Sequence, residues 1–66
     1  MKGTIVKWFD FRGFGFIEPE GEEDNVFAHV SEFKSRTDML KVGLDVEFEV
    51  ESSWKGPRAV NIKPLN

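Results

Sequence analysis

The stretch Arg12-Gly13-Phe14-Gly15-Phe16-Ile17 decides how the rest of the sequence is interpreted. Side chains alternate between the two faces of a β-strand, so Phe14 and Phe16 share one face while Ile17 takes the other. Isoleucine favours the core, which leaves two phenylalanines side by side on the outer face. Exposed rings are costly for a monomer unless something flat stacks on them. The stretch therefore indicates a binding surface.

A second stretch, Val26-Phe27-Ala28-His29-Val30, repeats this arrangement. Its aliphatic residues form a buried face, so Phe27 and His29 project outward with the first pair. Turning the phenylalanines inward would push all of these aliphatic side chains outward, because a one-residue shift of register reverses both faces. Four rings are therefore predicted to share one surface.

Five segments are predicted to be short strands, because they are rich in Val, Ile, Phe or Trp and are bounded by Gly, Pro, Asp or Ser. They cover residues 2–9, 13–18, 25–30, 44–51 and 57–63. The longest connection, residues 31–42, has room for a helical turn at most, with Phe33, Met39 and Leu40 as apolar anchors. This pattern predicts an all-β fold, a closed or nearly closed five-stranded antiparallel barrel without free sheet edges.

Two other phenylalanines are predicted to lie in the core. Residues 45–51 alternate acids with apolar side chains, so Phe48 and Val50 face inward and the acids form a solvated face. Phe9 precedes a turn and is also assigned to the core. Phe11, within that turn, is left undecided.

The composition fits one small domain over residues 1–66. A chain of this size buries only about 60% of the surface that its unfolded form exposes, yet it carries seven Phe and two Trp. Without cysteine it forms neither disulfides nor thiolate zinc sites. It has no apolar leader and no apolar run of about eighteen residues, so a soluble, cytoplasmic protein outside membranes is expected.

The formal charge of −3 argues against phosphate binding unless charges of opposite sign are separated on the surface. Acids gather at residues 18–24 and 45–51, whereas Lys and Arg are frequent near both ends of the chain. This distribution allows a basic face opposite an acidic one.

A row of rings flanked by cations suits single-stranded nucleic acid, because each base stacked on an aromatic side chain contributes about 1–3 kcal/mol whatever its identity. Lys7 and Arg12 would contact phosphates from one side of the row, and Lys55 and Arg58 from the other. Trp8, which follows Lys7 on the first strand, is predicted to be a fifth stacking platform. This kind of binding needs no cofactor.

Other chemistries have weaker support. His29 lacks a second His or Cys for a metal site, and Ser31 is expected to face away from it, so neither a metal ion nor catalysis is predicted. Residues 22–25 lack the spacing of a calcium loop and are interpreted as a solvated acidic turn. Gly13 and Gly15 form a bare Gly-x-Gly, which is weak evidence for a phosphate loop.

These motifs resemble the cold-shock domain family, small OB-fold (Greek-key) barrels that bind single-stranded RNA and DNA. Lys7-Trp8-Phe9 is similar to the family's first-strand signature, residues 12–17 to its first ribonucleoprotein motif, residues 26–30 to its second, and Gly56-Pro57 to the start of its last strand. By that resemblance the ligand-contacting positions are Lys7, Trp8, Arg12, Phe14, Phe16, Phe27 and His29, with Asp24 or Asn25 at a polar position near them.

The chain also departs from the family pattern. Asp10 stands where Asn is usual, and the turn holding Phe11 is one residue short. Val30 replaces one common aromatic residue and residues 37–38 another, which together remove about 2–6 kcal/mol of stacking. Trp54 either replaces part of this loss or caps the barrel end, and the sequence leaves both interpretations open.

The residues predict a non-enzymatic domain that binds single strands with low sequence specificity, and a monomer is expected. The resemblance implies that the protein keeps RNA unpaired, as an RNA chaperone in a stress or cold response. An SH3-like module that binds proline-rich peptide is the alternative, because its groove is also aromatic and an acidic surface suits basic peptides.

Overall fold

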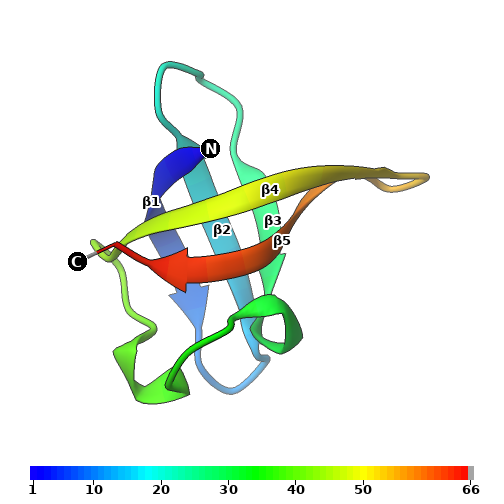
Figure 1. The fold of residues 1–66 in the computed structure, drawn as a ribbon. Helices are drawn as coiled ribbons and strands as arrows, with labels where there is room; N and C mark the ends of the chain where they lie inside the picture. Colours follow the sequence, from blue (N-terminus) through cyan, green and yellow to red (C-terminus); the bar gives the residue numbers. More distant parts are fainter. Residues whose placement is uncertain (66) are drawn as a thin grey trace.

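Five strands close into a barrel in a computed structural model that describes residues 1–65, all with side chains except Thr37 (Figure 1). The strands are β1 (Lys2–Phe9), β2 (Phe14–Pro19), β3 (Val26–His29), β4 (Asp45–Ser53) and β5 (Gly56–Pro64). Their order around the ring is β1-β2-β3-β5-β4, and β4 pairs with β1 to complete it. All five predicted strands are confirmed, with no end displaced by more than two residues.

One pairing differs from the predicted antiparallel barrel. β3 and β5 run in the same direction, with Phe27 opposite Arg58 and Ala28 opposite Ala59, while the other four pairings are antiparallel. A ring with an odd number of strands cannot alternate direction throughout, so closing five strands requires at least one parallel pair.

The barrel interior holds a single apolar core. Its buried members are Ile5, Ile17, Val26, Ala28, Phe33, Leu40, Val46, Phe48, Ala59 and Ile62. The connection after β3 contains two 3₁₀ turns rather than one, η1 (Val30–Glu32) and η2 (Thr37–Met39), and it packs against the barrel through the three predicted anchors. Figure 1 shows this connection below the strands. Neither turn is long enough to cross a lipid bilayer, and no other helix occurs in residues 1–65.

A bulge in β1 decides which way its last residues face. Ile5 pairs with Ile17 and Lys7 pairs with Phe16, so Val6 is an extra residue in the ladder. Such an insertion reverses the faces that follow it. Phe9 therefore lies outside the barrel, 42% exposed, and its assignment to the core is wrong.

The β4–β5 hairpin extends past the barrel, as Figure 1 shows at its right. Phe48 is fully buried, as predicted, but Val50 is 42% exposed. Val50 points to the same side of β4 as Phe48, but at this point the hairpin leaves the core and few side chains cover Val50. Its predicted burial is therefore wrong. The exposed Glu51, Ser52 and Ser53 continue the projecting part of the strand.

Gly15 brings β1 and β2 into close contact. It pairs with Trp8, and a Cβ atom at Gly15 would lie against the Lys7 carbonyl oxygen and 2.5 Å from Cε3 of Trp8. The missing side chain therefore makes room for the indole, which is half-buried and packs against the core.

Candidate nucleic-acid interface

Five rings form a continuous surface on β1, β2 and β3, called the aromatic face below: Phe9, Phe14, Phe16, Phe27 and His29. Phe14 is central, with ring centroids 5.2 Å from Phe9, 5.5 Å from Phe27 and 6.3 Å from Phe16. His29 continues the row 6.5 Å beyond Phe27. These spacings are typical of tilted and edge-to-face aromatic pairs, which hold one another in position.

The strand register explains why the rings share one side. Phe16 pairs with Phe27, and Phe14 pairs with both Phe9 and His29, so each row across the three strands points the same way. Ile17, on the opposite side of β2, is completely buried. The outward direction predicted for four of the rings is confirmed. Phe9 was missed, because only the bulge turns it outward.

Trp8 lies on the other side of β1 from the aromatic face. It pairs with Gly15, which in turn pairs with the buried Ala28. The structure therefore does not place Trp8 beside the phenylalanines as a fifth platform. Its partly exposed indole borders the end of β1, and its contact with a ligand stays a prediction.

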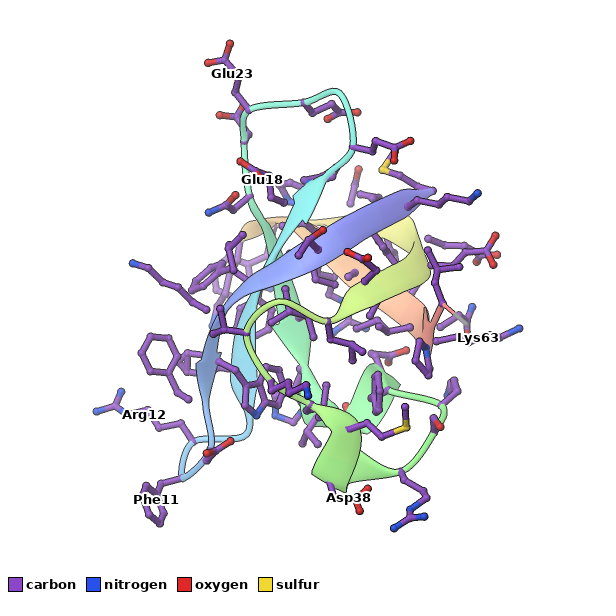
Figure 2. All side chains as sticks on the ribbon, turned by 90° about the vertical axis from the view of Figure 1, so that its left-hand side faces the viewer. Phe11, Arg12, Glu18, Glu23, Asp38 and Lys63 are labelled. Carbon is purple, nitrogen blue, oxygen red and sulfur yellow. The ribbon has the colours of Figure 1, made fainter. Side chains whose placement is uncertain are left out.

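The β1–β2 turn carries the cation Arg12 and the fully exposed Phe11. Both point away from the barrel in Figure 2, at the end opposite to Glu18 and Glu23. Lys7 is exposed and pairs with Phe16, so it borders the aromatic face. The acids of the β2–β3 loop and the cations near the aromatic face are thus separated along the molecule.

A groove of about 570 Å³ continues the aromatic face toward the β4–β5 hairpin. It is lined by Phe16, Phe27, Ser53, Trp54, Lys55, Gly56, Pro57 and Arg58. Trp54 is 90% exposed, so it does not cap the barrel end, and that interpretation is wrong. The Lys55 ammonium lies 5.0 Å from the Trp54 ring, within the range of a cation–π contact.

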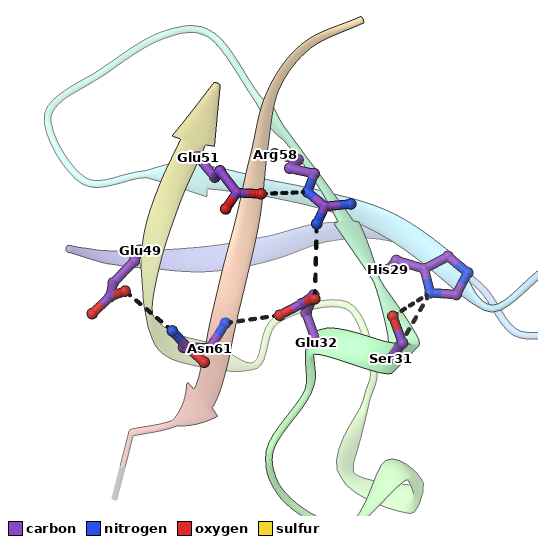
Figure 3. Close-up of polar contacts among 7 residues, drawn as sticks. All are labelled: His29, Ser31, Glu32, Glu49, Glu51, Arg58 and Asn61. Atoms are coloured by element: carbon purple, nitrogen blue, oxygen red, sulfur yellow. Dashed lines mark hydrogen bonds and ion pairs between the residues drawn. The ribbon is translucent and has the colours of Figure 1, made fainter. Parts of the chain in front are cut away.

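Arg58 reaches this groove with its charge already paired. Its Nε donates to Glu51 Oε1 at 3.2 Å, and its Nη2 lies 4.0 Å from Glu32 Oε2 (Figure 3). The sequence predicts a phosphate contact for Arg58 and gives no sign of either carboxylate. They come from β4 and η1, so no pattern local to β5 could have revealed them.

His29 and Ser31 are closer than the sequence indicated. The Ser31 amide donates to His29 Nδ1 at 3.1 Å, and Ser31 Oγ lies 3.0 Å from the same nitrogen. Residues two apart on a strand share a face, and His29 caps the start of η1 by accepting from this amide, so the prediction that Ser31 faces away from His29 is wrong. Because Nδ1 accepts the amide hydrogen, the neutral imidazole carries its own hydrogen on Nε2.

The fold and the site together define a class, a small closed OB-fold barrel with an outer face of aromatic rings. Residues 1–65 match the family model described as the 'Cold-shock' DNA-binding domain. The chain belongs to the cold-shock domain family, a non-catalytic family that binds nucleic acid. The peptide-module hypothesis finds no support in this match.

Individual relatives agree with the family match. Cold shock protein CspA of Staphylococcus saprophyticus is 48% identical over 67 residues, which cover 98% of this chain and 100% of the relative. Cold shock-like protein CspB of Yersinia pestis is 44% identical over 92% of this chain and 90% of its own. The solved structure of Drosophila Unr CSD456 has a TM-score of 0.83 at 28% identity, covering 98% of this chain and 26% of that one.

Proposed function

We propose that this chain, as one domain over residues 1–66, binds single-stranded RNA and DNA with low sequence specificity. Bases would stack on the aromatic face, while Lys7, Arg12 and Lys55 contact phosphates. The observation that carries the proposal is the continuity of the aromatic face, since rings 5.2 to 6.5 Å apart offer a row of stacking surfaces. Each stacked base contributes about 1–3 kcal/mol.

Single strands suit this surface better than duplexes, because the bases of a duplex are already stacked on one another. Binding a single strand also withdraws it from the duplex by mass action, so the protein would keep RNA unpaired without ATP or any cofactor. We therefore assign it the role of an RNA chaperone in a stress or cold response, acting as a cytoplasmic monomer without enzymatic activity.

The direct test is a fluorescence titration of the protein with oligothymidine, with a duplex of matched length and with a proline-rich peptide. Trp54 lines the groove and reports binding there through quenching. Oligothymidine should quench strongly and the duplex far more weakly, with no response to the peptide. Equal affinity for single strand and duplex would refute stacking as the mechanism.

The salt dependence of this binding should be shallow, because few cations border the aromatic face. With Lys7, Arg12 and Lys55 engaged, a plot of log Kd against log salt concentration should have a slope of magnitude about 2, at about 0.7 per phosphate. Titrations between 50 and 300 mM salt measure it. A slope of magnitude five or more would show that phosphate contacts, not stacking, dominate affinity.

Trp54→Ala should weaken binding in a length-dependent way. Trp54 lines the groove beyond Phe16 and Phe27, so only a strand long enough to reach it can lose a contact. Affinity for long oligonucleotides should fall by about 1–3 kcal/mol, the contribution of one stacked base, and affinity for short ones should fall less. The melting temperature should hardly change, since a side chain 90% exposed contributes little burial. Unchanged binding at every length would remove Trp54 from the site.

A further inference from the structure

Arg58 lies beside the aromatic face in a position that its strand pairing fixes. It pairs with Phe27 across the parallel β3–β5 contact and lines the groove together with Phe27 and Phe16. Neighbouring strands are about 4.8 Å apart, so a base stacked on Phe27 would bring one of its edges within reach of the Arg58 side chain.

Two carboxylates hold the guanidinium in place. Glu51 accepts from Nε at 3.2 Å, and Glu32 lies 4.0 Å from Nη2. Glu32 is itself fixed, because its Oε1 accepts from the Asn61 amide at 3.3 Å. Asn61 sits at a bulge in β5 with a positive φ of 52°, and its side-chain amide also donates to Glu49 at 3.1 Å.

The charge balance at this point does not favour a phosphate. One guanidinium faces two carboxylates, so the group carries a net negative charge next to the groove. A phosphate approaching Arg58 would meet both carboxylates, and like charges repel. A neutral base edge carries no such penalty, and it can accept hydrogen bonds from any N–H group that the carboxylates leave free.

Nη1 is the nitrogen of the Arg58 guanidinium, a planar fork of N–H groups, that neither carboxylate contacts. Within residues 1–65 it has no hydrogen-bond acceptor, and in Figure 3 it points away from both carboxylates, toward the side where His29 lies. Glu32 lies 4.0 Å from Nη2, too far to accept a hydrogen bond, so Nη1 and Nη2 together still present two parallel N–H groups at the end of the guanidinium. Guanine offers the matching pair of acceptors, O6 and N7, whereas adenine presents a donor amino group in place of O6.

We propose that Arg58 is a specificity-determining residue that reads a base edge, giving the site a guanine preference at the base stacked on Phe27. This inference rests on the proposed function, because it requires that a single strand occupies the aromatic face. Glu32 and Glu51 act through Arg58 as positioning residues: they orient the fork and cancel its attraction for phosphate.

The test uses oligothymidine in which one position at a time is replaced by guanine, adenine or 2-aminopurine, a purine that lacks O6. With guanine at its best position, the oligonucleotide should bind about 5- to 20-fold more tightly than with adenine or 2-aminopurine there. This factor is in the lower part of the range for a bidentate contact, because Arg58 is partly exposed. Arg58→Gln should abolish this preference and leave the salt slope unchanged. Arg58→Lys should abolish it too, because lysine keeps the charge but lacks the fork.

Two further variants separate recognition of guanine from attraction of phosphate. Lys7→Gln should lower the magnitude of the salt slope by about 0.7 and keep the guanine preference. Glu51→Gln should keep the preference but increase the slope, because Arg58 then attracts phosphate. The inference is overturned if wild-type protein binds single strands without preferring guanine, or if Arg58→Gln weakens all sequences equally and reduces the slope. Failure to bind any single strand would instead refute the proposed function, and the inference with it.

Discussion

The double variant Phe14→Ala/Phe27→Ala should lose about 2–6 kcal/mol of binding free energy for a single strand, at about 1–3 kcal/mol for each stacked base. These two rings lie at the centre of the aromatic face, 5.5 Å apart, so a strand that crosses it must pass over both. No charge changes, so the salt slope of the residual binding should stay close to that of the wild type. Fluorescence titration with oligothymidine measures both quantities.

The matched control is a phenylalanine on the inner side of the barrel. Phe48→Leu nearly conserves volume at a side chain only 1% exposed, so it should lower the stability of the fold and leave the affinity of folded molecules unchanged. Phe14 and Phe27 are half-buried, so the double variant also loses some stability, and its folded fraction must be measured by circular dichroism. If its affinity per folded molecule equals that of the wild type, the aromatic face is not the binding surface.

Gly15→Ala should destabilise the fold by more than about 3 kcal/mol, a loss near the severe end for a single substitution. The new methyl group would meet the backbone carbonyl of Lys7 and the Trp8 ring, so β1 and β2 must separate locally. A domain of 66 residues has only about 3–10 kcal/mol of stability in total, so much of the variant should be unfolded at room temperature. Urea and thermal denaturation measure the loss.

Gly21→Ala is the control for adding a methyl group to a glycine. Gly21 has a φ of 81° but open space around it, so only its left-handed backbone opposes the substitution, at about 1–2 kcal/mol. That corresponds to a drop in melting temperature of about 4–16 °C at this size. If Gly15→Ala melts no lower than Gly21→Ala, the close contact between β1 and β2 is not a structural requirement.

The strands were predictable because their signal is local. Alternating side chains in residues 12–17 and 26–30 identify both the strands and their outward faces. Because Ile17 must be buried in the core, only one face of its strand can point outward. The two motifs that predict binding of single-stranded nucleic acid lie in the same two segments. The fold and the candidate site therefore follow from one pattern.

What failed depends on pairing between distant segments. A bulge is a property of two strands in register, so the sequence around Val6 gives no sign that Phe9 turns outward. Likewise, the ion pairs of Arg58 with Glu32 and Glu51 join β5 to two other elements, so no local pattern predicts them. The exposure of Val50 follows from where β4 leaves the barrel, which strand alternation does not encode.

Closure of the ring by β3 and β5 also bears on how the protein is made. A chain synthesised from its N-terminus produces β1, β2 and β3 first, and with them every ring of the aromatic face. Until β5 emerges from the ribosome, β3 has no neighbour on one side, so the nascent sheet combines an unpaired edge with clustered rings. That combination promotes aggregation. The interval between synthesis of β3 and docking of β5 is therefore when a new molecule most needs protection from its neighbours.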